Sequence, residues 1–111
     1  MTAETPTRKE RTFTNRRYLD AIADHIVIFD GAMGTSIQNY DITIEDYGGQ
    51  QYEGCVDYLS VTRPAIIREI HASFLSVGSE VVETNTFRGN RWTLAEYGLG
   101  DQILDVNRAA A

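Results

Sequence analysis

The fold of this chain is decided by residues 26–35, which read Ile-Val-Ile-Phe-Asp-Gly-Ala-Met-Gly-Thr. An unbroken run of β-branched and aromatic residues is typical of a strand buried on both faces in a parallel sheet. Asp30 then falls at the carboxyl end of that strand, where α/β sheets and (β/α) barrels bind their ligands. Gly31 and Gly34 permit backbone angles that a Cβ would forbid, and they let a ligand approach the main chain. We therefore expect a ligand site at this strand end.

A second strand is predicted after the clearest helix of the chain. The helix covers residues 64–77, where apolar side chains recur at helical spacing, and Gly78 ends it. Residues 80–87, Glu-Val-Val-Glu-Thr-Asn-Thr-Phe, then read as a strand that runs into a polar turn. Strand, helix and strand form a βαβ unit, so Asp30 and residues 84–86 should meet at one edge of a parallel sheet.

The remaining segments are predicted to be short helices and one long connection. The connection, residues 41–58, has weak periodicity but contains several tyrosines, which indicates a segment packed on the surface rather than a flexible linker. The aromatic side chains of Phe87 and Trp92 are expected in the core. Helices are predicted at residues 15–23, 35–40, 91–97 and 101–111.

Length and composition limit the classes of protein. The 111 residues suffice for one small domain, and 42% hydrophobic with 23% charged residues is ordinary for a soluble globular sequence. No apolar run approaches the roughly 20 residues that cross a bilayer, and no secretory signal is visible. Cys55 is the single cysteine, so an intrachain disulfide is excluded and a reducing cytoplasmic location is favoured.

The net charge of −6 is unevenly distributed. Residues 1–17 are basic and are expected to form a disordered tail, which makes the rest of the chain still more acidic. An acidic body without a basic, aromatic-rich patch is a poor surface for nucleic acid. The composition therefore predicts neither a nucleic-acid partner nor a membrane partner.

Each candidate site residue also has a simple structural explanation that involves no ligand. Asp30 could bind an amine, ligate a metal or act as a base, but it could equally cap the following turn. The 83–86 turn is more simply explained by side chains that satisfy loop amides, and the glycines match no phosphate-binding fingerprint. Cys55 lies in an acidic loop without a base partner, which favours an inert thiol over a nucleophile.

Four motifs follow one another in order. They are Phe29-Asp-Gly-Ala-Met-Gly-Thr35; Leu59-Ser-Val-Thr-Arg-Pro64 with Ile67-Arg-Glu-Ile-His71; Val82-Glu-Thr-Asn-Thr-Phe87; and Asn90-Arg91 with Leu94-Ala-Glu-Tyr-Gly-Leu99. Over residues 18–111 the sequence resembles the start of the homocysteine-binding (homocysteine S-methyltransferase) domain of cobalamin-dependent methionine synthases and their relatives. Proteins fused to methylenetetrahydrofolate reductase look similar over the same segments.

The resemblance implies a (β/α)8 TIM barrel that transfers a methyl group to homocysteine to give methionine. In that family zinc, held by three cysteine thiolates, binds the homocysteine sulfur, and a metal-bound thiol is deprotonated. The methyl group comes from a cobalamin or folate-linked donor on other domains, which are therefore implied partners. By the same resemblance, Asp30 and the Gly31 amide hold the amino-acid end of homocysteine, while Thr84, Asn85 and Thr86 line the pocket.

The chain departs from the family at the metal. The three zinc cysteines of the family lie on later strands, and Cys55 matches none of them. We therefore expect residues 18–111 to be a truncated N-terminal portion of the barrel, about two parallel strands with crossover helices, that carries no metal ligand or catalytic residue and is inactive alone. Two alternatives stay open: a betaine- or S-methylmethionine-type homocysteine methyltransferase, and a non-catalytic α/β remnant.

Overall fold

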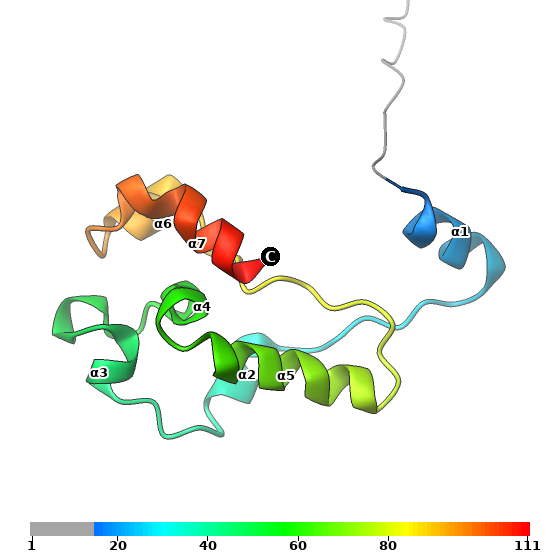
Figure 1. The fold of residues 1–111 in the computed structure, drawn as a ribbon, viewed down its shortest axis with the longest axis horizontal. Coiled ribbons are helices and arrows are strands. Elements are labelled where there is room, and N and C mark those ends of the chain that lie inside the picture. Colours follow the sequence, from blue (N-terminus) through cyan, green and yellow to red (C-terminus); the bar gives the residue numbers. More distant parts are fainter. Residues whose placement is uncertain (1–14) are drawn as a thin grey trace, which may run out of the picture.

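The computed structural model describes residues 15–111, so the predicted disordered tail, residues 1–17, lies almost wholly outside the described part. The described residues form helices and short 3₁₀ turns joined by extended segments (Figure 1). In chain order these are α1 (Arg17–Asp24), α2 (Met33–Ile37), α3 (Ile44–Tyr47), η1 (Gln50–Tyr52), η2 (Val56–Tyr58), α4 (Leu59–Thr62), α5 (Pro64–Ser76), α6 (Arg91–Ala95), η3 (Gly100–Gln102) and α7 (Ile103–Ala110).

The prediction of two strands is wrong in its extent. Between residues 15 and 111 the two segments meet in one isolated parallel bridge, Phe29 to Val81, and no strand is formed. Parallel strands are stable when further strands and helices flank them, whereas the side chain of Ile26 is 90% exposed here. The barrel itself therefore stays a prediction, and the described residues contribute only a parallel contact to it.

The parallel contact nevertheless places the two predicted strand ends side by side. The Asp30 N–H donates to the Val81 carbonyl at 3.0 Å, and the Glu80 N–H donates to the Ile28 carbonyl at 2.8 Å. The chain leaves both segments in the same direction, because the bridge is parallel. Asp30 and the 83–86 turn consequently lie next to each other, as the βαβ pattern predicts.

The long central helix is confirmed. α5 begins at Pro64, whose missing N–H costs nothing at a helix start, and its apolar side buries Ile67 and Ile70. After α5 ends at Ser76, Val77 caps the helix and Gly78 follows with a φ of 113°, a left-handed conformation that glycine adopts without strain. α5 thus ends where the sequence predicts, and the chain turns back toward the Phe29–Val81 bridge.

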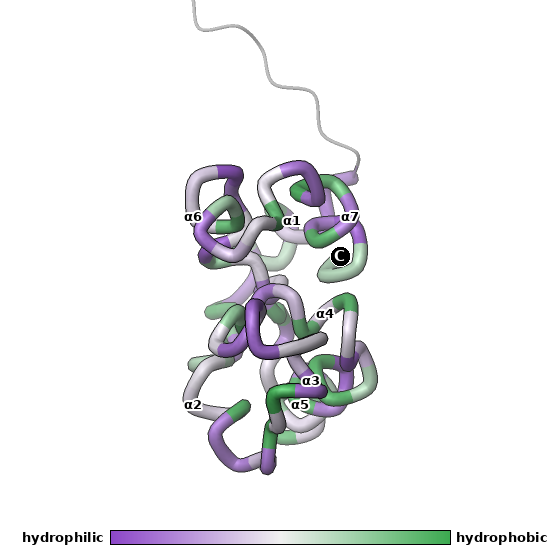
Figure 2. Tube along the Cα trace, turned by 90° about the vertical axis from the view of Figure 1, so that its left-hand side faces the viewer, coloured by the Kyte–Doolittle hydropathy of each residue, from purple (hydrophilic) through white to green (hydrophobic). Residues whose placement is uncertain are grey.

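The buried apolar residues form two clusters, with α4 between them. The first cluster joins α2, α4 and α5, and the second joins α6 and α7 to the loop before η2. Figures 1 and 2 both place α6 and α7 in one half of the molecule and α2, α3 and α5 in the other. The first cluster is Ile37, Leu59, Ile67 and Ile70, and the second is Cys55, Leu94, Leu99 and Val106.

The connection 41–58 is packed, as predicted. α3 opens with a capping box, in which the Thr43 hydroxyl accepts from the Asp46 N–H and the Asp46 carboxylate accepts from the Thr43 N–H. That hydrogen bond from the Thr43 backbone lowers the pKa of Asp46, and Arg63 lies 3.0 Å from the same carboxylate. The rings of Tyr52 and Tyr58 pack against each other in a tilted arrangement, with centroids 5.0 Å apart and ring planes at 55°. Aromatic packing and capping together order this segment.

The expectation that Phe87 and Trp92 lie in the core is wrong. Their side chains are 98% and 83% exposed. Hydrophobicity alone identifies a residue that benefits from burial, but burial also requires other elements to cover the side chain, and the described elements leave these two residues largely uncovered. Among the described residues, no helix is long and apolar enough to cross a membrane.

α1 is attached to the rest of the molecule by two contacts. The Tyr18 ring meets the Phe29 ring edge to face, with centroids 6.1 Å apart. His25, directly after α1, places Nε2 at 2.7 Å from a Glu80 carboxylate oxygen and Nδ1 at 3.0 Å from Asp24. The hydrogen bond to Glu80, followed by that to Asp24, raises the pKa of His25 above its ordinary value of 6.5.

We expect the attachment of α1 to depend on pH. The folded-state pKa of His25 is raised. The stabilisation that protonated His25 gives to the contact with Glu80 is therefore fully present below pH 6.5, and it is lost as the pH rises through the pKa of the folded state. An NMR titration of the imidazole should give a pKa above 6.5 in the wild type and a lower pKa in Glu80→Gln. Glu45→Gln, an exposed change in α3, should leave that pKa unchanged; equal values in all three chains would contradict the contact.

Candidate functional site

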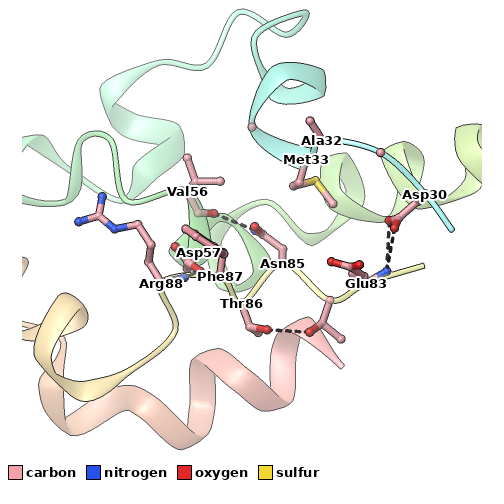
Figure 3. Close-up of a pocket in the computed structure, with 13 residues that line it drawn as sticks. Asp30, Ala32, Met33, Val56, Asp57, Glu83, Asn85, Thr86, Phe87 and Arg88 are labelled. Carbon is pink, nitrogen blue, oxygen red and sulfur yellow. Dashed lines mark hydrogen bonds between the residues drawn. The ribbon is translucent and has the colours of Figure 1, made fainter. Parts of the chain in front are cut away.

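A cavity of about 370 Å³ opens where the two predicted strand ends meet (Figure 3). One wall is the turn after the Phe29–Val81 bridge together with the start of α2, and the opposite wall is residues 83–88 with part of η2. The cavity is lined by Asp30, Gly31, Ala32, Met33, Gly34, Val56, Asp57, Glu83, Thr84, Asn85, Thr86, Phe87 and Arg88. The predicted ligand site at the strand end is therefore a real hollow.

Asp30 connects the two walls of this cavity. Both of its carboxylate oxygens accept the Glu83 N–H, each at 3.2 Å, and Figure 3 draws the pair at one end of the hollow. A carboxylate that receives one shared N–H keeps lone pairs free for a further donor. Asp30 thus binds the turn after the other segment rather than the turn that follows it in sequence, and it can still accept a hydrogen bond from a ligand donor.

Gly31 is a position where a side chain would not fit easily. A Cβ placed there would lie 3.1 Å from the Phe74 ring, which is closer than most real Cβ contacts. Phe74 packs against the first cluster, so its ring has little room to yield. The absence of a Cβ leaves the Gly31 backbone open to the cavity, which is the condition for a main-chain N–H to reach a ligand.

The 84–86 turn presents alternate residues to opposite sides. The Thr84 and Thr86 hydroxyl oxygens lie 2.7 Å apart, as Figure 3 shows, while Asn85 is 6% exposed. The Asn85 Nδ2 group donates to the Val56 carbonyl at 2.9 Å and to the Ser60 hydroxyl at 3.3 Å. The hydroxyl pair is thus available to a ligand, and the Asn85 amide nitrogen is engaged with the protein.

All five predicted site residues line this one cavity: Asp30, Gly31, Thr84, Asn85 and Thr86. Two further lining residues, Asp57 and Arg88, were not among the predicted site residues. Asp57 belongs to the long connection, for which the sequence predicts a segment packed on the surface but no particular site residue. Arg88 directly follows Thr86-Phe87 in the sequence, and nothing in its spacing predicts that it lines the same cavity.

The charges around the cavity favour a positively charged group. Three lining side chains are carboxylates, Asp30, Asp57 and Glu83, whereas Arg88 is the one cation among the lining residues. The Arg88 guanidinium reaches away to Glu96 at 3.4 Å. An excess of carboxylates over cations in a partly desolvated hollow attracts an ammonium group and repels an isolated anion.

Zinc does not fit the described residues. In residues 15–111 no three His, Cys, Asp or Glu side chains come close enough together to hold a metal ion. Cys55, the only thiol, is 3% exposed and packs among the apolar residues of the second cluster. A tetrahedral zinc site requires several converging thiolates or imidazoles, and residues 15–111 do not bring such a set together.

We expect Cys55 to react slowly with thiol reagents. Burial, the largest cause, raises the pKa of the Cys55 thiol, and the thiolate is the reactive form. A disulfide-exchange reagent at neutral pH should therefore label the folded chain at least about 10-fold more slowly than the same chain in denaturant. Equal rates in the two conditions would show that Cys55 is accessible and contradict its place in the second cluster.

Comparison with known proteins identifies the protein family to which this chain belongs. The family model of homocysteine S-methyltransferase matches residues 27–111, and this chain therefore belongs to that family. The matched range begins with the Phe29–Val81 bridge segment and includes every residue that lines the cavity.

Two curated relatives narrow the comparison to methionine synthases. The chain is 39% identical over 90 residues to the methionine synthase of Mycobacterium tuberculosis (strain ATCC 25618 / H37Rv), and 38% identical over 90 residues to that of Mycobacterium leprae (strain TN). In both cases the match covers 81% of this chain and 7% of the relative. The chain thus spans a small part of the length of the relatives that it matches.

Proposed function

We propose that this chain forms the substrate-anchoring part of a homocysteine S-methyltransferase of the methionine synthase type. The observation that carries the proposal is the cavity at the Phe29–Val81 bridge, since all five predicted substrate residues line it and the family match covers it. In this proposal residues 18–111 are the first portion of a (β/α)8 barrel domain in a longer cytoplasmic protein. Methyl transfer to homocysteine would be the activity of that longer protein.

The cavity suits the amino-acid end of homocysteine. The Asp30 carboxylate would accept hydrogen bonds from the substrate ammonium while it keeps its contact with the Glu83 N–H. The exposed Gly31 backbone would donate to the substrate carboxylate. The Thr84 and Thr86 hydroxyls, which can donate or accept, would complete the pocket together with the carbonyl oxygen of Asn85.

The metal and the methyl donor belong to other segments in this proposal. Zinc would make the homocysteine sulfur a thiolate, and a cobalamin or folate-linked group would supply the methyl. The residues of this chain bind and orient the substrate, and orientation alone lowers the barrier of a bimolecular reaction. A betaine- or S-methylmethionine-type donor would use the same anchoring contacts, so the cavity does not favour one donor over another.

The test is a titration of the chain with homocysteine, followed by NMR. Millimolar homocysteine should shift the amide resonances of Gly31 and of the 84–86 turn, because these groups face the bound amino-acid end. 4-Mercaptobutyrate, which lacks the ammonium, should shift them less at equal concentration. Shifts that are equal for the two compounds, or that lie outside the cavity, would contradict the proposed orientation.

A further inference from the structure

The buried polar side chains of the described residues gather in one place. Asp57 is 5% exposed, Ser60 is 3% exposed and Asn85 is 6% exposed, and no other polar residue between 15 and 111 is buried to this degree. Asp57 and Ser60 lie in η2 and α4, whereas Asn85 follows the Phe29–Val81 bridge. We call these three residues the polar clip.

Hydrogen bonds of the polar clip join two segments that are distant in sequence. The Asn85 Nδ2 group donates to the Val56 carbonyl at 2.9 Å and to the Ser60 hydroxyl at 3.3 Å. The Arg88 N–H donates to the Asp57 carboxylate at 3.1 Å. Residues 85–88 are therefore held at both ends against η2 and α4, as the contacts around Asn85 in Figure 3 illustrate.

Burying the polar side chains of the polar clip costs free energy compared with burying apolar side chains. A buried carboxylate or amide must be paired, and apolar side chains of similar volume often give equal or greater stability. What a buried polar contact adds is geometry, because only one arrangement of the two segments satisfies its donors and acceptors. The polar clip thus specifies how the 84–88 segment lies on η2.

That geometry sets the course of the cavity wall, to which Thr84, Asn85 and Thr86 all contribute. The chain bends at Asn85, and with Asn85 anchored on η2 the Thr84 and Thr86 side chains point to the other side of the bend (Figure 3). Their hydroxyl oxygens then meet at 2.7 Å on the cavity wall. The Arg88 anchor fixes the far end of the same wall.

We infer that Asp57 is a positioning residue of the homocysteine pocket. It acts through the Arg88 N–H on the wall that carries Thr84 and Thr86, and its acceptor oxygen, rather than its negative charge, is the group required. This inference rests on the proposed function. It predicts that a neutral acceptor at position 57 suffices for substrate binding and that loss of the acceptor does not.

The test compares Asp57→Asn with Asp57→Ala in the whole chain. Asp57→Ala removes the acceptor for the Arg88 N–H and should raise the Kd for homocysteine about tenfold, the effect of one unsatisfied buried donor. Asp57→Asn keeps a carbonyl acceptor and should stay within about twofold of the wild type. Hydrogen exchange of the Arg88 amide should accelerate in Asp57→Ala only.

A matched control separates positioning from loss of stability. Val106→Ala opens the second cluster away from the cavity and should lower the melting temperature while leaving the homocysteine Kd unchanged. If Asp57→Asn binds as weakly as Asp57→Ala, the charge is what matters and the inference is overturned. It is also overturned if Val106→Ala weakens binding as much as Asp57→Ala does.

Failure of the proposed function has a different signature. If the wild-type chain does not bind homocysteine, the positions of the Thr84 and Thr86 resonances still report on the wall. A shift of both in Asp57→Ala, absent in Asp57→Asn and in Val106→Ala, would support positioning by Asp57 while the choice of substrate fails. Unchanged Thr84 and Thr86 resonances in Asp57→Ala would overturn the inference itself.

Discussion

Replacement of Asp30 by asparagine should lower kcat/KM for homocysteine by between about 10- and 100-fold, the effect of one hydrogen bond to a charged group. The measurement needs a complete enzyme, because the chain spans 7% of its methionine synthase relatives. The matched 90-residue segment can be placed in the Mycobacterium tuberculosis methionine synthase, and methionine formation can be followed there. In that chimera, Asp30 would face the bound amino acid.

The asparagine variant isolates the charge of Asp30 from its structural contact. An amide oxygen can still accept the Glu83 N–H, which the carboxylate receives at 3.2 Å, so the turn should remain in place. What is lost is the attraction between a carboxylate and an ammonium. Asp30→Ala loses both contacts and should reduce activity further and also lower the melting temperature.

The control for this experiment is Asp41→Asn. Asp41 is exposed, and it does not line the cavity, so the change removes the same charge at a distance. Its kcat/KM should match that of the unmodified chimera. Equal activity of Asp30→Asn and Asp41→Asn would refute a role for Asp30 in substrate binding, and a folded but inactive unmodified chimera would favour the non-catalytic remnant.

The largest effect on stability is expected for Leu59→Ala. Leu59 is fully buried at the start of α4 and packs with Ile37, Ile67 and Ile70 in the first cluster. Removal of a buried leucine side chain costs about 2–5 kcal/mol, through lost burial and the cavity that remains. Small domains have only about 5–15 kcal/mol of stability, so this loss is a large share of the total and the unfolding midpoint should fall strongly.

Leu104→Ala is the matched control for that prediction. It is the same substitution on a helix, but the Leu104 side chain on α7 is 67% exposed and leaves no cavity. Its free energy of unfolding should stay within about 0.5 kcal/mol of the wild type. Urea denaturation followed by circular dichroism measures both variants. Similar losses in the two would show that the first cluster does not hold the fold together.

Local pattern was sufficient for α5 and for the place of the cavity. The apolar residues of α5 recur at helical spacing, with Pro64 at the start of the helix and Gly78 just after its end. This signal lies within a single segment, and the structure confirms the helix. The position of Asp30 after an apolar run, with a parallel partner, predicts where a ligand can reach the backbone. Local periodicity determines the helix, and the βαβ pattern, which fixes the relative direction of two distant segments, determines the place of the cavity.

The exposure of Phe87 and Trp92 could not be predicted from local sequence patterns. Both are aromatic and both are almost fully exposed, because burial depends on whether another element arrives to cover them. The strand at residues 26–29 is a similar case. Its β-branched residues favour an extended conformation, but a sheet requires neighbouring strands, and only the contact to Val81 is present.

The family, the main helix and the five residues that meet at the cavity could all be read from local motifs and their order. The contact between Asp57 and Arg88, two further lining residues, became visible only in the folded chain, because Asp57 lies in a connection without clear periodicity. The folded chain also shows that Asn85 is anchored to Val56 and Ser60 while Thr84 and Thr86 face outward. The physical reason is that hydrophobic periodicity and turn residues act over a few positions. A partly buried hydrogen bond between residues 31 positions apart exists only once packing has brought the two residues together.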